Sequence, residues 1–210
     1  MVDFKAEPDR TGLLVIDMTN EFLKEGSPLE VPAGRKMVPR LKRVIETCRS
    51  EDVPVIYTRH VLREDGTNAG LFGEFYQAVR DKKAHVQGSE GVEIYDEIFP
   101  EKDDIVISKH RYSAFYETDL DTVLKNMGID TLIISGVLTN LCCESTARDA
   151  MFRDYRVIFL RDCNATFDLP DFGFGEVSKE EIQKSVCSTI AFGIGSVKAS
   201  ETVIEELKNR

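Results

Sequence analysis

The stretch TLIISGVLTNLCCESTARDA, residues 131–150, joins a buried strand to a helix. Thr131 to Ser135 is a short apolar and β-branched run, typical of a strand that is covered on both faces. After Gly136 the pattern changes, and we expect a helix from about Leu141 to Asp154. A buried strand that runs directly into a helix is the repeating unit of α/β folds.

The same alternation extends toward both ends of the chain. Further apolar runs predict strands at residues 13–16, 53–57, 105–107, 157–160 and 196–198. Helical spacing and end signals predict helices over 34–50, 118–128, 178–192 and up to 209, two of them with capping boxes, Thr118-x-x-Asp121 and Ser178-x-x-Glu181. We therefore predict an α/β fold: a single doubly wound, Rossmann-like, three-layer αβα sandwich with a mostly parallel six-stranded sheet.

The length of the chain, 210 residues, suits one domain with a sizeable core. No linker, repeat or low-complexity segment divides it, so we expect residues 1–210 to form a single domain. Residues 61–100 are rich in glycine and have weak periodicity. Connections of that length are usually functional, so we expect a large insertion near the active site.

Composition excludes several classes of partner. The net charge is −10 and no run of Lys or Arg interrupts it, which argues against nucleic acid and anionic membranes. The N-terminus has no signal-peptide pattern, and no apolar stretch approaches the length of a membrane span. The five cysteines are odd in number, irregularly spaced and without a CxxC or zinc spacing, which predicts a reducing, cytoplasmic setting.

Three predicted strands end in side chains that can carry chemistry. Asp17 follows the first strand, Lys109 follows the third, and Cys142 begins the helix after the fourth. Because ligands bind beyond the C-terminal ends of strands in open α/β sheets, these groups should meet at one edge. We expect Lys109 and the helix N-terminus to lower the pKa of the thiol, and Asp17 to take up and return its proton.

Three motifs follow one another in a fixed order. They are VIDMTNEF at 15–22, SKHRYSAF at 108–115 and GVLTNLCCESTARDA at 136–150. In that order they resemble the D-x-Q-N-D-F, K-x-x-x-S-A-F and G-V-x-T-N-x-C-V-x-x-T-A-x-D-A elements of the isochorismatase-like cysteine hydrolase superfamily. The resemblance extends from about Leu13 to Val197 and is specific because three motifs agree.

The resemblance implies the reaction centre. It carries over a catalytic triad of Asp17, Lys109 and Cys142, with Cys142 as the nucleophile. It also implies a cis peptide between Val137 and Leu138, and an oxyanion hole formed by the backbone N–H groups of Leu138 and Cys142.

The chain departs from the family pattern at several positions. Thr19 stands where Gln is common and Glu21 where Asp is common, which we expect to alter the pocket lining more than the chemistry. Cys143 stands where Val is usual and is expected to pack in the core.

The metal-binding branch of the superfamily, the nicotinamidases, carries D-x-H after the second strand and a later His. Here the segment reads Thr58-Arg59-His60, and the other histidines are His85 and His110. Because the Asp is missing, we predict no metal and no other cofactor. Together with DGTNAG at 65–70, this segment is more similar to the N-carbamoylsarcosine amidase and ureidoacrylate amidohydrolase branches.

Several side chains near the motifs are candidates for contacting a substrate. Each also has a structural explanation, as a core aromatic, a satisfied histidine or a surface ion. We expect a structural role for Arg148, and helix capping by Thr139 and Asn140. The substrate-binding candidates are Phe22, His60, Arg111 and Tyr112.

The predicted function is a cysteine-dependent amidohydrolase that cleaves a C–N bond of a small amide, ureido or carbamoyl compound through a covalent thioester. One alternative is an isochorismatase-type vinyl-ether hydrolase, which needs no thiol and would keep its activity after Cys142→Ala. A second is a non-catalytic small-molecule-binding member of the fold, against which the complete triad argues. The resemblance also implies a homo-oligomer, a homodimer or homotetramer.

Overall fold

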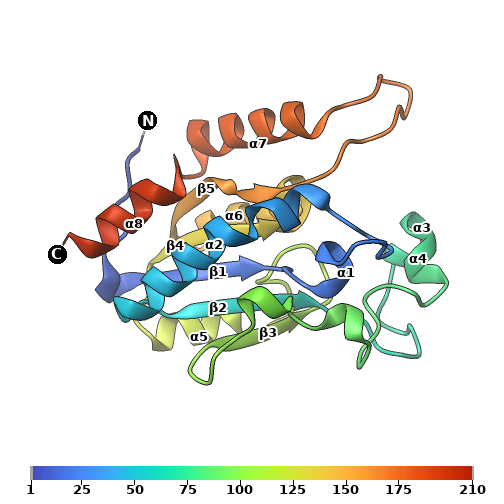
Figure 1. The fold of residues 1–210 in the computed structure, drawn as a ribbon, viewed down its shortest axis with the longest axis horizontal. Coiled ribbons are helices and arrows are strands. Elements are labelled where there is room, and N and C mark those ends of the chain that lie inside the picture. The colour runs from blue at the N-terminus through green and yellow to red at the C-terminus, as the bar shows by residue number, and fades with distance from the viewer. Residues whose placement is uncertain (1, 210) are drawn as a thin grey trace.

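The computed structural model describes residues 2–209 and contains a six-stranded sheet in which all neighbouring strands are parallel. The order across the sheet is β3-β2-β1-β4-β5-β6 (Figure 1). The strands are β1 (Thr11–Ile16), β2 (Val55–His60), β3 (Ile105–Lys109), β4 (Thr131–Val137), β5 (Arg156–Ala165) and β6 (Ser196–Lys198). The predicted α/β fold with a doubly wound sheet is confirmed, and the sheet is parallel throughout.

Helices cover both faces of this sheet. One face carries α2 (Pro32–Ser50) and α8 (Ser200–Lys208), and the other carries α5 (Leu120–Asn126), α6 (Glu144–Met151) and α7 (Lys179–Gly193) (Figure 1). The short helix α1 (Asn20–Leu23) follows β1. Among residues 2–209, no helix is both long and apolar enough to cross a membrane.

The two helical layers explain why the strands are apolar on both faces. Successive side chains of a strand point to opposite faces of the sheet. Leu13 and Val15 accordingly pack in the core beneath α2 and α8, whereas Leu14 and Ile16 pack in the core beneath α5, α6 and α7. Both clusters are fully enclosed, so the central strands carry no polar face.

The strand order reverses between β1 and β4, which lie side by side in the middle of the sheet. Ile16, the last residue of β1, pairs with Thr58 on one side and with Gly136 on the other. The C-terminal ends of these strands therefore meet at one edge. That crevice is the usual ligand position in doubly wound folds.

Several boundaries differ from the sequence-based expectations. Strand β2 was expected at 53–57 but lies at Val55–His60, so His60 is its last residue. Strand β5 was expected at 157–160 but extends to Ala165. The register between β4 and β5 shifts here, and the Asn164 amide donates to the carbonyls of Ile134 (3.0 Å) and Leu160 (2.6 Å), which keeps the extra residues in the strand.

One of the two predicted capping boxes forms. At α7, Ser178 Oγ accepts from the Glu181 N–H and the Glu181 carboxylate accepts from the Ser178 N–H at 3.0 Å. At α5 the predicted box is absent: the Thr118 hydroxyl accepts from the Leu120 N–H at 3.3 Å and donates to the Ala114 carbonyl at 2.5 Å. That helix begins at Leu120, two residues later than expected.

The insertion at 61–100 lies over the C-terminal edge of the sheet (Figure 1). It contains α3 (Phe72–Phe75), α4 (Gln77–Arg80) and the 3₁₀ turns η2 (Glu90–Val92) and η3 (Asp96–Ile98). A small core of Leu62, Phe72, Val79 and Ala84 holds it together. Phe72 also contacts the side chain of Tyr112, so the insertion reaches the motif segment that follows β3.

Candidate active site

Three strand ends bring a carboxylate, an ammonium and a thiol together. The Lys109 ammonium lies 2.6 Å from Asp17 Oδ2 and 3.4 Å from Cys142 Sγ. It donates a third hydrogen bond to the Arg111 carbonyl at 3.0 Å, so all three of its donors are used. Asp17 and Lys109 are 0% exposed and Cys142 is 4% exposed. The pairing compensates two charges that water cannot reach.

The Asp17 carboxylate is held on its other side by β2. Thr58 Oγ1 donates to Asp17 Oδ1 at 2.8 Å, and the Asp17 N–H donates to the Thr58 carbonyl at 3.1 Å. Asp17 has a φ of 51°, in the left-handed region that Asp tolerates better than most residues. This turn at the end of β1 directs the carboxylate toward Lys109.

The turn that carries Cys142 begins at a glycine with a strict steric role. Gly136 has a φ of 127°, and a Cβ there would lie 2.0 Å from the Ile16 carbonyl oxygen. The next peptide, Val137–Leu138, is cis, as the resemblance implied. A π-helical turn, η4 (Thr139–Cys143), then places Cys142 before α6. The helical segment thus begins earlier than the expected Leu141.

Thr139 and Asn140 do not cap this helix, contrary to expectation. Thr139 donates to the Gln183 side chain on α7 at 2.7 Å, and Thr166 donates to the Asn140 side chain at 2.8 Å. Their side chains bond to neighbouring elements instead of to the backbone N–H groups of the helix. The two residues tie the cysteine turn to α7 and to the end of β5.

The electrostatics of the thiol differ from the prediction. Burial raises the pKa of Cys142 to about 12, although the charge of Lys109 acts in the opposite direction. Burial also disfavours the charged form of Lys109, but the charges and hydrogen bonds of Asp17 and Cys142 together outweigh it, and the pKa of Lys109 is raised. The expected lowering of the thiol pKa was therefore wrong. In the resting site, the sulfur carries its proton and Lys109 stays charged.

A small pocket of about 40 Å³ opens onto the cysteine. The structure places three of the predicted substrate-binding residues, Phe22, His60 and Tyr112, in its wall. Arg111 does not line it, because its guanidinium donates to the carbonyls of Asn68 (3.0 Å) and His110 (2.6 Å). The complete lining is Phe22, Leu29, His60, Phe72, Tyr76, His85, Tyr112, Leu138, Leu141, Cys142 and Phe167.

Much of this wall was not found from the sequence. Phe72, Tyr76 and His85 come from the insertion, whose weak periodicity gave no indication of which side chains point inward. The hydroxyls of Tyr76 and Tyr112 form a hydrogen bond of 2.8 Å, and the two side chains close the pocket from one side. Burial raises the pKa of Tyr112, and its bond with Tyr76 acts in the same direction, so Tyr112 is uncharged at neutral pH. The only sequence feature that could have drawn attention to His85 is that the chain has just three histidines.

Two histidines stack beside the cysteine. The rings of His60 and His85 lie 4.1 Å apart at an angle of 15°. His85 is paired through Nδ1 with the buried Glu21 carboxylate, which also accepts the His85 N–H at 2.9 Å. Glu21 therefore positions a pocket residue, which agrees with the expectation that this departure alters the lining.

Asp17, His60 and Cys142 are the side chains, among residues 2–209, that are close enough to share a metal ion. Their ligand atoms lie within 4.8 Å of one another. However, the Lys109 ammonium already binds Asp17, and a cation in this cluster would meet that buried positive charge. Thr58, at the position of the metal-binding branch's Asp, brings no charge and uses its hydroxyl hydrogen on Asp17. The donor set does not suit a divalent metal.

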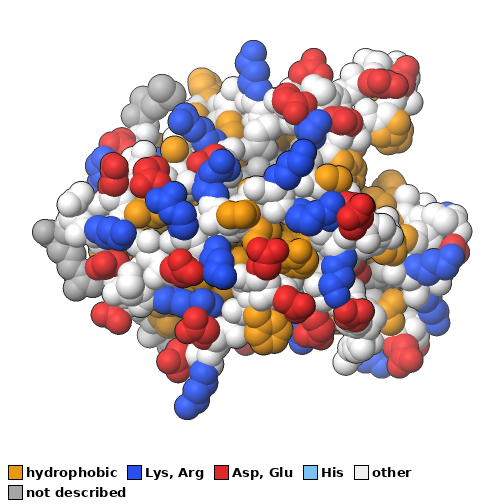
Figure 2. Space-filling view, viewed as in Figure 1, with side chains coloured by type: hydrophobic (Ala, Val, Ile, Leu, Met, Phe, Trp, Pro, Cys, Tyr) orange, Lys and Arg blue, Asp and Glu red, His pale blue; other side chains and the backbone are white. Residues whose placement is uncertain are grey.

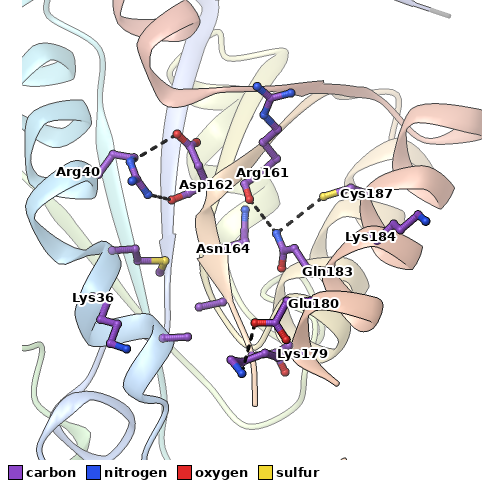
Figure 3. Close-up of a pocket in the computed structure, with 14 residues that line it drawn as sticks. Lys36, Arg40, Arg161, Asp162, Asn164, Lys179, Glu180, Gln183, Lys184 and Cys187 are labelled. Carbon is purple, nitrogen blue, oxygen red and sulfur yellow. Dashed lines mark hydrogen bonds and ion pairs between the residues drawn. The ribbon is translucent and has the colours of Figure 1, made fainter. Parts of the chain in front are cut away.

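A larger groove of about 690 Å³ lies elsewhere, between α2 and α7 beside the end of β5 (Figure 3). Basic side chains, among them Lys36, Arg161 and Lys184, surround it, and Arg40 is paired with Asp162. None of the three clustered groups Asp17, Lys109 and Cys142 lines this groove. Volume therefore does not identify the site, because the candidate nucleophile Cys142 lines the smaller pocket.

The chain and its fold match known proteins. The family model for the isochorismatase domain matches residues 11–178. The chain is 34% identical over 183 residues to nicotinamidase 3 of Arabidopsis thaliana, covering 86% of this chain and 80% of that protein. It is 30% identical over 212 aligned residues to the ureidoacrylate amidohydrolase RutB of Serratia proteamaculans strain 568, covering 88% and 84%. The crystal structure of a cysteine hydrolase from Pseudomonas syringae pv. phaseolicola 1448A superposes with a TM-score of 0.95 at 37% identity, covering 99% and 96%.

Proposed function

The chain belongs to the isochorismatase family of hydrolases, and from that membership we propose that it is a cysteine-dependent amidohydrolase. Its substrate is a small amide, ureido or carbamoyl compound, and the bond that it cleaves is a C–N bond. The observation that carries the proposal is the buried Lys109 ammonium, which contacts both Asp17 and Cys142. A vinyl-ether hydrolase has no use for a thiol in that position.

The first half of the reaction forms an acyl-enzyme. The Asp17 carboxylate takes the proton of Cys142 as the sulfur attacks the carbonyl carbon, so no free thiolate need accumulate. The new S–C bond turns the carbonyl into an oxyanion. When that intermediate collapses, the C–N bond breaks and Asp17 gives its proton to the leaving nitrogen. Lys109 keeps Asp17 charged before the attack and stabilises the sulfur as it loses its proton.

The second half returns the enzyme to its starting state. Asp17, again a carboxylate, takes a proton from water, and the resulting hydroxide attacks the thioester or thiocarbamate carbonyl. The C–S bond breaks, and the sulfur recovers the proton from Asp17. The products are an amine or ammonia and a carboxylic or carbamic acid.

We assign the oxyanion to the backbone N–H groups of Leu138 and Cys142. Both residues line the pocket, and Leu138 directly precedes the π-helical turn that contains Cys142. Backbone donors fixed in this way stabilise developing charge without reorganisation. The small apolar pocket, which Arg111 does not line, favours an uncharged substrate over a carboxylate-bearing one.

Ammonia or amine release from a panel of carboxamides, ureido acids and carbamoyl amino acids tests the function. We expect turnover of at least one member by the wild type and loss of turnover in Cys142→Ala. Cys143→Ala is the matched control, because Cys143 is an adjacent buried thiol that does not line the pocket. Amine or ammonia release that survives Cys142→Ala would refute the thiol mechanism, and inactivity on every member would favour the ether-hydrolase or the binding-protein alternative.

A further inference from the structure

His60 presents a polar atom to the pocket that nothing in the protein satisfies. The ring lines the pocket, the residue is 2% exposed, and Nε2 is buried with no hydrogen-bond partner among residues 2–209. An unpaired buried polar atom is costly unless something else supplies its partner. In an enzyme pocket that partner is most simply the bound substrate.

The ring is held in place on several sides. His85 stacks on one face, with ring centres 4.1 Å apart, and Phe72 meets it edge-on at 5.0 Å. His85 is in turn fixed by its pair with Glu21. His60 therefore cannot turn away to find another partner, and its Nε2 remains available to a ligand.

The hydrogen bonding of His60 defines which role Nε2 can take. The side chain bonds to the backbone of His110, and this bond raises the pKa of the ring, as a bond donated to a carbonyl does. Because Nε2 has no partner, Nδ1 makes this bond and carries the proton. Burial, the dominant effect, holds the pKa of His60 well below 6.5, so the ring is neutral. Nε2 is thus a lone-pair acceptor that requires an N–H or O–H donor.

We propose that His60 Nε2 accepts a hydrogen bond from an N–H group on the scissile nitrogen, and that it thereby selects amide, ureido and carbamoyl substrates that carry such an N–H over esters. This inference rests on the proposed function and deepens it by assigning the residue that recognises the leaving nitrogen.

The position of His60 relative to the reacting groups supports this assignment. A carboxylate oxygen of Asp17, a ring nitrogen of His60 and Cys142 Sγ all lie within 4.8 Å of one another. A nitrogen bonded to the carbon under attack by the sulfur would lie between Asp17 and His60. In the tetrahedral intermediate this nitrogen has N–H bonds and one lone pair. If one N–H points to Nε2, the lone pair can face Asp17, which holds the proton that the nitrogen must receive before the C–N bond breaks.

The prediction distinguishes amides from esters. An ester has no N–H to donate, and its alkoxide leaves with less need for a placed proton. Loss of the acceptor should therefore reduce amide turnover while ester turnover changes little. A single neutral hydrogen bond corresponds to an effect of about tenfold on kcat/KM, and misplacement of the lone pair adds to it.

The test measures kcat/KM for one accepted amide and the methyl ester of the same acid in the wild type, His60→Leu and His60→Gln. We expect His60→Leu to lose about tenfold or more on the amide and less than about threefold on the ester. His60→Gln should recover part of the amide activity, because its amide oxygen is an acceptor. Equal losses on both substrates, or no loss on the amide, would overturn the proposal.

A second measurement does not depend on a folded variant. In the wild type, the N-methylamide keeps one N–H and the N,N-dimethylamide has none, so activity should fall sharply only at the second methyl group. A gradual decline over both steps would contradict the proposed hydrogen bond. Mass spectrometry of the enzyme mixed with the ester reports separately on the proposed function. Acylation of Cys142 with an unchanged amide-to-ester ratio in His60→Leu refutes only the role of His60, whereas no acylation refutes the thiol mechanism itself.

Discussion

At the residue scale, the site depends on one ammonium shared by two partners. Lys109 bonds to Asp17, to the thiol and to a backbone carbonyl, and both members of the Lys109–Asp17 ion pair are fully buried. Burial outweighs this cation at the sulfur, so the proton stays on Cys142 until a substrate is attacked. Such an arrangement protects the thiol from oxidants, since the thiolate is the reactive form.

This proton placement predicts the pH dependence of alkylation. Because the pKa of Cys142 is raised to about 12, the thiolate fraction at neutral pH is small and grows about tenfold for each pH unit up to that value. We expect iodoacetamide to label Cys142 slowly at pH 7, with a rate that still rises above pH 9. Peptide mapping after timed labelling gives the rate, and a plateau at or below pH 8 would contradict the prediction.

Removal of the ammonium should destabilise the fold as well as abolish catalysis. Lys109→Met leaves Asp17 buried without its counter-ion, a change that costs about 3–5 kcal/mol. Lys125→Met is the matched control, because Lys125 makes an exposed pair with Asp121 at 2.7 Å and its loss costs less than about 0.5 kcal/mol. Urea unfolding of the two variants measures the difference. Similar losses of stability in both would show that the buried pair contributes little.

At the element scale, the catalytic turn depends on the close approach of β1 and β4. Their pairing brings Ile16 against Gly136, and the backbone there has no room for a side chain. The same contact brings the end of β1, with Asp17, next to the turn that carries Cys142. The pairing of β1 with β4 therefore also fixes the position of Asp17 relative to Cys142.

Gly136→Ala tests that constraint. The added Cβ would lie 2.0 Å from the Ile16 carbonyl, and the positive φ is unfavourable for alanine, so we expect a loss of about 2–4 kcal/mol together with loss of activity. Gly193→Ala is the control, since nothing lies within 4 Å of a Cβ at that end of α7. It should be neutral or stabilise the protein by up to about 1 kcal/mol. Thermal unfolding compares them, and equal melting temperatures would refute the steric argument.

At the scale of the whole molecule, two segments extend from the sheet. The insertion at 61–100 closes the pocket, and residues 166–178 form an arm between β5 and α7 that projects from the body (Figure 1). Figure 2 shows hydrophobic and acidic side chains together on this projection. Phe172 and Phe174 at its tip are 70% and 93% exposed, which is unusual for aromatic side chains of a monomer.

The arm and the groove at its base are complementary in charge. The arm carries Asp168, Asp171 and Glu176, and the groove between α2 and α7 is bordered by cations, of which Lys36 and Lys184 have no ion pair within residues 2–209 (Figure 3). The groove lies where the arm joins the body. If two copies align their arms in antiparallel fashion about a two-fold axis, the tip of each arm reaches the groove of the other copy. The family resemblance implied a homodimer or a homotetramer, and we propose a homodimer formed through these arms.

Light scattering after size-exclusion chromatography tests this assembly. We expect the wild type to have twice the mass of one chain, and Phe172→Ser/Phe174→Ser to have the mass of one. Phe192→Ser is the control, because Phe192 is also 93% exposed but does not line the groove. A monomeric wild type, or dissociation by the control as well, would contradict the arm-mediated dimer.

The sequence went far in determining the fold and the reaction centre, because both depend on local patterns. Apolar runs that alternate with helical spacing predicted the layers and all six strands. Polar residues at strand ends indicated which groups meet, since parallel strands end at a common edge. Strand limits were less accurate, as at β2 and β5, where hydrogen bonds from neighbouring strands extend the element beyond its apolar run.

Only the tertiary structure decided the properties that depend on burial and on contacts between distant segments. The sequence supplied Cys142 and Lys109, but the depth of the site set the direction of the thiol pKa, because desolvation depends on everything packed around the sulfur. The insertion contributed Phe72, Tyr76 and His85 to the pocket without a readable pattern, because their inward direction comes from packing against the sheet edge rather than from local periodicity. The sequence thus determined which atoms can react, and the fold decided their charge state and what they can recognise.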